Sequence, residues 1–200
     1  MFNEQSERKY RDKDSVFNQR GERKYLNATE RSAFLRVVKK EPDALRRAFG
    51  LTLFYAGCRI SEALHLTAER IDLADKNFVF ETLKRRRRGC FRAVPVPDGL
   101  IRLCRTAVTG LKPSDRLWPF SRATGYRLVR KYMARAGIKG DMACPKGLRH
   151  GFAVACIEQK IPLTTLKKWM DHARLETTAI YLEVSGDEER ALAKRLWEND

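Results

Sequence analysis

The amino-acid sequence predicts an α+β fold that is mainly α-helical and carries one small antiparallel β-hairpin. Apolar residues recur at helical spacing through most of the chain after residue 26. Between residues 78 and 96 the apolar positions alternate on either side of a basic, glycine-containing turn, which is typical of a hairpin. The 200 residues, 43% of them hydrophobic, suffice for one well-packed domain but not for two full-sized ones.

The N-terminal segment differs in composition from the rest of the chain. Residues 1–25 mix charges of both signs without apolar periodicity, so we expect a basic, polar arm that is poorly ordered. The folded domain is expected over residues 26–200. Asn27 and Glu30 have the spacing of a capping box ahead of an apolar stretch, which predicts that the first helix begins there.

Further helices are expected where apolar residues repeat with a helical period, over residues 45–54, 60–66, 100–108, 123–136, 149–159, 163–170 and 177–182. Gly57 is expected to end the second helix. The two hairpin strands are marked by Phe78, Phe80, Val94 and Val96.

The charge of the chain indicates a polyanionic partner. Lysine and arginine number 41 against 25 acidic residues, a net charge of +16, which is far more than solubility requires. DNA, ribosomal RNA and an anionic membrane surface all fit this charge. No apolar run is long enough to span a membrane and the N-terminus is too polar for a secretory signal, so a cytoplasmic location is expected.

The cysteines and acidic residues do not suggest a metal site. The five cysteines form no CxxC pair and are odd in number, which favours reduced thiols over disulfides or zinc. The single DxD pattern, Asp12 and Asp14, lies in the polar arm. We therefore expect no metal and no cofactor.

Two arginines are candidates for binding a phosphate group. Arg59 follows a glycine turn, and Glu62 can steady its guanidinium for a bidentate grip on phosphate, although a capping or surface arginine fits the same pattern. Lys146 and Arg149 are three residues apart at the start of a helix, where backbone amides favour anions. His150, beside Arg149, fits either this site or the core.

Three other positions extend the candidate set. His172 ends one predicted helix and Tyr181 lies in the next, although a tyrosine in an amphipathic helix most often serves packing. Lys84 lies at the start of the hairpin turn and precedes a basic run, Arg85, Arg86, Arg87 and Arg88. In isolation this turn fits a solvated surface as well as a DNA contact.

Taken in order, these residues resemble the signature of the tyrosine recombinase family, which includes phage integrases and chromosome-dimer resolvases. GCRISEAL resembles the first-arginine motif, LKRRRRGCFRAVPVP the hairpin lysine motif, PKGLRHGFAV the second-arginine box, and WMDHARLETTAIY the histidine-to-tyrosine stretch. The resemblance runs from Leu26 to Leu182 and implies the catalytic-domain fold of that family, with its small antiparallel sheet.

The resemblance also implies a reaction, the site-specific cleavage and rejoining of double-stranded DNA in integration, inversion, excision or resolution. Tyr181 would attack the phosphorus to give a 3′-phosphotyrosine and a free 5′ hydroxyl. The phosphate would be bound by Arg59, Arg149 and His172, with Glu62 orienting the cations. Lys84 would protonate the leaving oxygen, and neither metal nor ATP would be required.

Two departures from the family pattern limit this comparison. Lys146 stands where the family usually has a histidine, so the base that deprotonates Tyr181 is open, with His150 as one candidate. The first 25 residues are too few for the N-terminal clamp domain of other members. The chain is therefore expected to be either a catalytic domain cut from a longer protein or similar to the short fimbrial-switch invertases.

In relatives, a segment after the nucleophile packs into the neighbouring protomer of a tetramer on DNA. A helix expected over residues 186–198 carries Leu192, Leu196 and Trp197 on one face, and either docks in this way or covers its own core. The resemblance also implies accessory DNA-bending proteins and a place at the nucleoid. Two alternatives stay open: a type IB topoisomerase, and a non-catalytic DNA-binding regulator that uses GCRISEALHLT as a helix-turn-helix.

Overall fold

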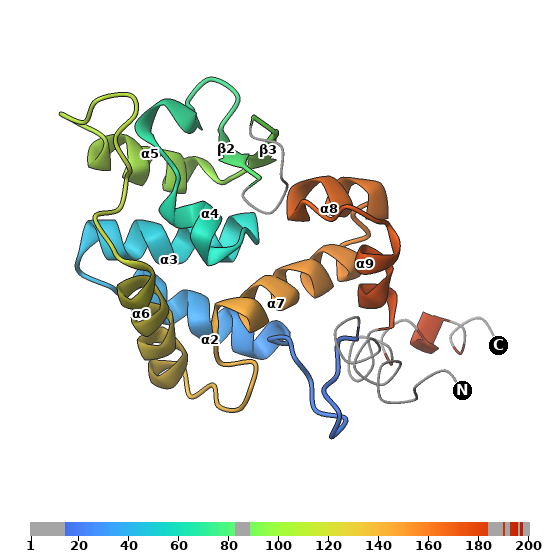
Figure 1. Ribbon diagram of the computed structural model, residues 1–200. Coiled ribbons are helices and arrows are strands. Elements are labelled where there is room, and N and C mark those ends of the chain that lie inside the picture. The colour runs from blue at the N-terminus through green and yellow to red at the C-terminus, as the bar shows by residue number, and fades with distance from the viewer. Residues whose placement is uncertain (1–14, 83–88, 184–189, 191–192, 196, 198–200) are drawn as a thin grey trace, which may run out of the picture.

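The computed structural model describes residues 15–82 and 89–183, together with residues 190, 193–195 and 197. Its longer helices are α2 (Ala28–Lys39), α3 (Ala44–Ala56), α5 (Asp98–Ala107), α6 (Arg122–Arg135), α7 (Pro145–Glu158) and α8 (Leu163–Met170). The shorter ones are α4 (Ile60–Leu64), α9 (Glu176–Ala179) and the 3-10 turns η1 (Ala68–Arg70) and η2 (Ile180–Leu182). Helices predominate, as the sequence predicts (Figure 1).

The boundaries of α2 and α3 follow from local chemistry. The Asn27 side chain accepts a hydrogen bond from the Glu30 amide, and the Glu30 carboxylate accepts one from the Asn27 amide, both at 2.9 Å. This reciprocal pair satisfies two amides that a helix start otherwise leaves unpaired, so the predicted capping box is confirmed. Helix α3 ends at Gly57, whose φ of 55° lies in the left-handed region.

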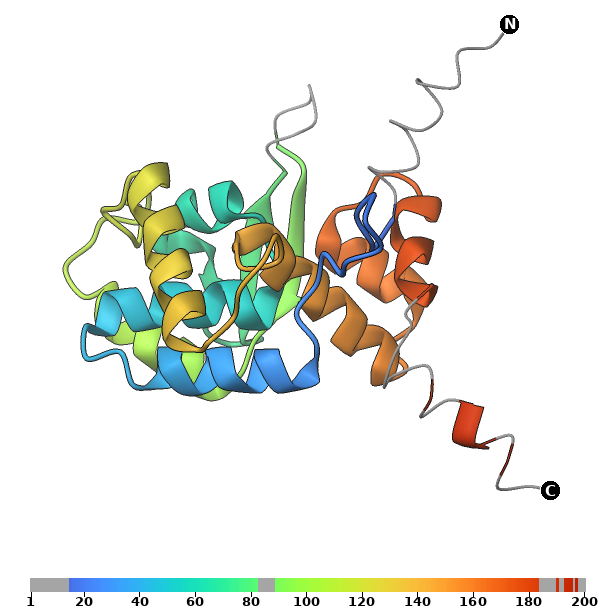
Figure 2. The same cartoon turned by 90° about the horizontal axis from the view of Figure 1, so that it is seen from below.

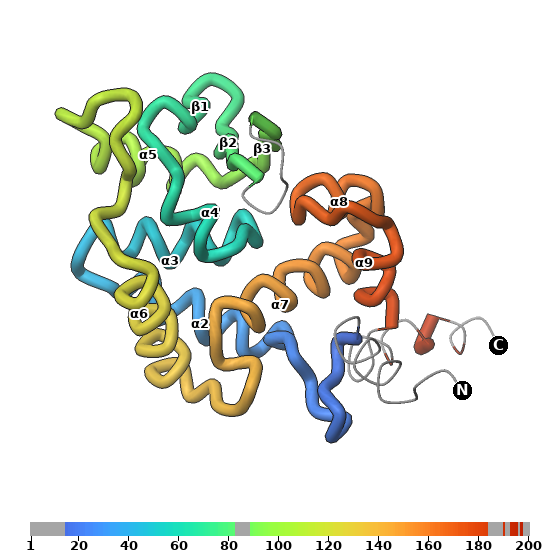
Figure 3. The backbone as a smooth tube through the Cα atoms, in the orientation of Figure 1, coloured from blue at the N-terminus to red at the C-terminus, as the bar shows by residue number. Residues whose placement is uncertain are grey.

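A three-stranded antiparallel sheet, in the order β1-β2-β3, contains the predicted hairpin (Figure 3). Its strands are β1 (Ile71–Asp72), β2 (Asn77–Glu81) and β3 (Phe91–Pro95). Phe78 pairs with Val94 and Phe80 with Arg92, so these four residues share the buried face. Lys84 and Arg85 to Arg88, the residues predicted to contact DNA from the hairpin tip, lie outside the described part of the chain.

Two hydrophobic clusters form the core, and helix α7 contributes to both. The larger cluster combines residues of α2 to α6 with residues of the sheet and includes Leu148 of α7. The smaller one joins Phe152 and Val154 of α7 to Met170 and Tyr181. Figure 2 shows the corresponding division, with α8 and α9 on one side of α7 and α2, α3 and α6 on the other. Gly57 lies at the junction, because a Cβ there would overlap the ring of Phe152.

The N-terminal arm differs from our expectation in its second half. Residues 15–25 pack on the smaller cluster, where Val16 and Tyr25 are fully buried, and a bridge joins Phe17 to Arg23. These apolar residues are held by contacts with distant parts of the chain, which no local periodicity reveals. The expected disorder is therefore wrong for residues 15–25, while residues 1–14 lie outside the described part.

The C-terminal helix expected over residues 186–198 lies mostly outside the described residues. Residues 190, 193–195 and 197 are helical, and the Arg190 guanidinium lies 5.8 Å from the centroid of the Trp197 ring. Across the described ranges of the chain, none of the helices has the length and apolar content of a membrane span.

Candidate active site

Arg59 lies at the start of α4, directly after the turn at Gly57 and Cys58. Its Nη1 donates to Glu62 Oε1 at 2.6 Å, and its backbone amide donates to Glu62 Oε2 at 2.7 Å. Glu62 is one helical turn further on and only 2% exposed. The predicted pairing of this arginine with a steadying carboxylate is therefore present.

Arg149 approaches the same carboxylate from α7. Its Nη1 donates to the carbonyl of Gly57 at 2.9 Å and lies 3.9 Å from Glu62 Oε2, and its Nη2 donates to the carbonyl of Met170. Proline occupies the first position of α7, which leaves Arg149 in the second turn rather than at the start of the helix. The two candidate arginines, 90 residues apart in sequence, thus share Glu62.

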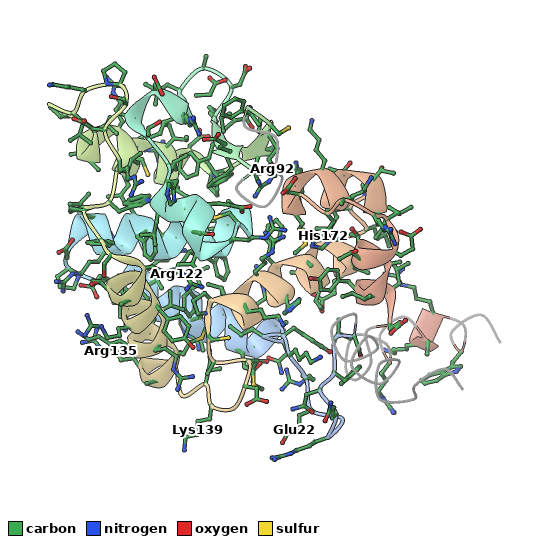
Figure 4. The ribbon with its side chains drawn as sticks, viewed as in Figure 1. Glu22, Arg92, Arg122, Arg135, Lys139 and His172 are labelled. Carbon is green, nitrogen blue, oxygen red and sulfur yellow. The ribbon has the colours of Figure 1, made fainter. Side chains whose placement is uncertain are left out.

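Arg92, on β3, is a member of this cluster that the sequence analysis missed. Its Nη2 donates to Glu62 Oε2 at 2.6 Å and its Nε to the carbonyl of Trp169 at 2.7 Å. Figure 4 shows Arg92 between the hairpin and α8, consistent with these bonds. A signal was available, because Arg92 alternates with Val94 on the buried face of β3, and Val96 continues the alternation just after the strand.

Asp171 is the second residue that the sequence analysis missed. Its Oδ2 accepts from Arg59 Nη1 at 3.2 Å, and its backbone carbonyl accepts from Arg59 Nη2 at 3.4 Å. No local pattern could have found it, because its partner lies 112 residues earlier. Asp171 brings the turn before His172 against the first arginine.

We call Arg59, Arg92, Arg149, Glu62 and Asp171 the arginine cluster. Burial raises the pKa of Glu62, but the combined effect of Arg92, Arg59 and Arg149 is larger and leaves that pKa below its ordinary value. Burial, followed by the charge of Arg59, lowers the pKa of Arg149 to about 10. Both groups therefore stay charged at neutral pH, and the arginines are ready to receive an anion.

Tyr181 lies in the smaller hydrophobic cluster and is 1% exposed. Burial raises the pKa of Tyr181 to about 12, against the opposing charges of Arg149 and Arg59. Its hydroxyl oxygen is 2.7 Å from His150 Nδ1, and its ring stacks on that of His172 with centroids 6.3 Å apart. Two of the predicted site residues thus contact the candidate nucleophile directly.

Both histidines are neutral at pH 7. Burial, followed by the positive charges of Lys146 and Arg149, lowers the pKa of His150 to about 3. Burial and the charges of Arg149 and Arg59 do the same for the pKa of His172, also to about 3. A neutral imidazole accepts a hydrogen bond at one nitrogen, so His150 Nδ1 can accept from the Tyr181 hydroxyl. We call Tyr181, His150, His172 and Thr178, whose hydroxyl is 3.0 Å from His172 Nδ1, the tyrosine pocket.

Lys146 is an exposed residue in the otherwise buried first turn of α7. Its charge reaches His150, as the lowered pKa indicates, but no hydrogen bond or ion pair within the described residues joins it to Tyr181. The structure therefore brings together Arg59, Glu62, Arg149, His150, His172 and Tyr181, and leaves Lys146 at the edge of the site.

The surroundings of the site are suited to an anion. A cavity of about 290 Å³ lies between β3 and α8, and its lining includes Arg92, Lys167, Lys168 and His172. Within the residues that the structure describes, no three side chains of the types that bind metals come together.

Comparison with known proteins decides the family. The sequence model of the phage integrase family matches residues 24–188, which is most of the chain. The chain belongs to the phage integrase family. It is 29% identical over 176 residues to the tyrosine recombinase XerA of Pyrococcus furiosus, and 32% identical over 159 residues to XerD of Vibrio vulnificus.

The match to XerA covers 81% of this chain and 58% of the relative, and the match to XerD covers 72% and 51%. The chain therefore spans little more than half of the length of these two relatives. Among solved structures, the XerA recombinase gives a TM-score of 0.72 at 21% identity, over 86% of this chain and 62% of that one. XerH bound to its difH substrate, a pre-cleavage complex, gives a TM-score of 0.70 at 20% identity, over 94% of this chain and 61% of the XerH chain. The predicted catalytic-domain fold is confirmed.

Proposed function

We propose that this chain is a site-specific DNA recombinase that cuts and rejoins strands through a 3′-phosphotyrosine at Tyr181. The observation that carries the proposal is the juxtaposition of a cluster of arginines, paired with buried Glu62, with a tyrosine hydroxyl bonded to a neutral histidine. XerH, a related fold, is described as bound to its DNA substrate, which supports double-stranded DNA as the substrate here.

Arg59 and Arg149 are the groups that would hold the non-bridging oxygens of the scissile phosphate. A phosphorane intermediate carries one more negative charge than the diester, and arginines fixed before the reaction stabilise that charge without reorganising. Glu62 fixes both guanidiniums, which suits a positioning role. His172 would donate a further hydrogen bond to the phosphate.

The Tyr181 proton needs an acceptor, because burial raises the pKa of Tyr181 to about 12. His150 Nδ1, 2.7 Å from the hydroxyl, is the acceptor that we propose. The bond from Tyr181 oxygen to phosphorus forms as the bond to the 5′ oxygen breaks, and that oxygen takes a proton from Lys84, the proposed acid. Lys146 takes no proton in this scheme; its positive charge lowers the pKa of His150.

Because the phosphodiester energy is kept in the tyrosyl phosphate, a 5′ hydroxyl of another strand can reverse the step without ATP or metal. Arg85, Arg86, Arg87 and Arg88 would contact the DNA backbone. We also propose a tetramer on DNA, held by the helix expected over residues 186–198, with accessory DNA-bending proteins and action at the nucleoid.

The test is covalent trapping in EDTA on a pool of nicked duplexes of random sequence. The wild type is expected to give a protein–DNA adduct that survives SDS, and Tyr181→Phe none. Tyr126→Phe, at an exposed tyrosine on α6, is the matched control and should behave as the wild type. Adducts that persist in Tyr181→Phe, or no adduct from the wild type on any duplex, would contradict the proposal.

A further inference from the structure

Asp171 occupies a backbone conformation that disfavours a side chain. It caps the C-terminus of α8 with φ 51° and ψ 49°, in the left-handed region where residues with a Cβ are uncommon. Lys76 and Lys160 are the other non-glycine residues with positive φ in the described part of the chain. Of the three, Asp171 is the one whose side chain forms an ion pair with a residue of the candidate site. Such an outlier at a candidate active site suggests a function for its side chain.

The contacts of Asp171 fix one end of the Arg59 guanidinium. Asp171 Oδ2 and Glu62 Oε1 both accept from Arg59 Nη1, at 3.2 and 2.6 Å, which accounts for the two hydrogens of that nitrogen. The Asp171 carbonyl takes one hydrogen of Nη2. Within the described residues, no hydrogen bond uses the Nε–H or the other Nη2 hydrogen, and these form an edge suited to two phosphate oxygens.

The turn that contains Asp171 also contacts the other arginine. The carbonyl of Met170, the preceding residue, accepts from Arg149, and the following residue is His172. Three consecutive residues therefore contact both phosphate-binding arginines and carry the histidine that stacks on Tyr181. A change in how Arg59 binds Asp171 would shift the first arginine relative to the tyrosine pocket.

We propose that Asp171 is a positioning residue for cleavage of the phosphodiester. With Glu62 it holds Arg59 so that the Nε–Nη2 edge faces the same scissile phosphate as His172. The catalytic part of this inference rests on the proposed function; the geometry of Arg59 does not. The carboxylate takes Nη1 rather than the proposed phosphate edge, so it does not block an anion. Three arginines and two carboxylates also leave the cluster with a net positive charge.

The first test compares Asp171→Gly with Asp171→Asn in single-turnover adduct formation at saturating DNA. Glycine suits the left-handed backbone but removes the carboxylate that accepts from Arg59 Nη1. We expect the rate of adduct formation to fall about tenfold or more, with DNA affinity unchanged. Asparagine tolerates the same backbone and keeps an oxygen acceptor, so it should stay within about threefold of the wild type. Lys160→Gly, at φ 57°, is the matched backbone control and should have no effect.

A double-mutant cycle tests whether Asp171 acts through Arg59. In an Arg59→Lys background, Asp171→Gly should change the rate less than about twofold, because the two groups would no longer be coupled. Additive losses, an Asp171→Gly rate equal to or above the wild type, or Asp171→Asn as slow as Asp171→Gly would each overturn the proposal.

A second readout does not require cleavage. Binding of inorganic orthovanadate, measured by calorimetry, is expected to weaken about tenfold in Asp171→Gly and not in Lys160→Gly. Unchanged or tighter binding in Asp171→Gly would overturn the inference even if the wild type forms no adduct. Absence of a Tyr181-dependent adduct, with vanadate binding as expected, would instead count against the proposed function alone.

Discussion

The arginine cluster and the tyrosine pocket are adjacent, but they treat buried charge in opposite ways. In the cluster, Glu62 is nearly inaccessible and ionised, and three arginines surround it. In the pocket, burial keeps Tyr181, His150 and His172 in their neutral forms. Partners within hydrogen-bond distance make the difference, because a buried charge persists only where opposite charges compensate its lost hydration.

The difference meets two requirements of the proposed strand-transfer reaction. The groups that bind the phosphate must be charged before the substrate arrives, and ion pairs with Glu62 and Asp171 achieve this. The proposed nucleophile must keep its proton until the phosphate is in place, and burial achieves that by raising the pKa of Tyr181. A phosphate bound in the cluster would offset the positive charge of Arg149, which lowers the pKa of His150, and so would make His150 a better proton acceptor.

Removing the shared carboxylate should have the largest effect on stability. Glu62→Ala leaves Arg59, Arg92 and Arg149 without their common partner, and we expect the free energy of unfolding to fall by about 3–5 kcal/mol. Glu62→Gln, which keeps an oxygen acceptor, should lose less. Urea unfolding followed by circular dichroism measures both, and equal losses in the two variants would show that charge pairing is not what holds the cluster together.

The tyrosine pocket should make stability sensitive to mild acid. The pKa of His150 and of His172 is about 3 in the fold, against an ordinary value of 6.5, so the unfolded chain binds protons more readily. Stability contributed by the neutral histidines is complete above about pH 6.5 and is lost as the pH falls toward about 3, by up to about 1.4 kcal/mol per pH unit and histidine.

The control for this pH dependence is His172→Gln. Between pH 6 and 4 it should reduce the slope of unfolding free energy against pH by about 1.4 kcal/mol per pH unit, which corresponds to one proton. Glu62 contributes its own pH dependence in both proteins, so the difference between them isolates the histidine. A slope unchanged by the substitution would mean that His172 is already protonated in the fold.

The smallest expected effect is at Thr178, a fully buried residue of the tyrosine pocket. Thr178→Val keeps the shape but removes the hydroxyl that lies 3.0 Å from His172 Nδ1, so stability should fall by about 1 kcal/mol. Thermal unfolding measures the change, and Thr178→Ser, which keeps a hydroxyl, is the matched control. Unchanged stability in Thr178→Val would show that the hydroxyl contributes nothing to stability.

Most of the helices, the capping box and the hairpin could be predicted, because each depends on residues close together in the sequence. Most of the candidate site could be predicted as well, since its motifs are local. Arg92 was missed although its alternation with Val94 marked it as buried. Asp171 could not be found, because its role depends on an arginine 112 residues away. The packing of Val16 and Tyr25 was hidden for the same reason.

Gly57 restricts which substitutions this site can tolerate. It accepts a hydrogen bond from Arg149, has a left-handed backbone and leaves no room for a Cβ beside Phe152. Directed evolution of the proposed activity can therefore vary exposed positions around the site, but every replacement of Gly57 would disturb the acceptor of Arg149 and the packing of the smaller cluster together. Variant libraries that hold position 57 as glycine should keep a much larger folded fraction than libraries that randomise it.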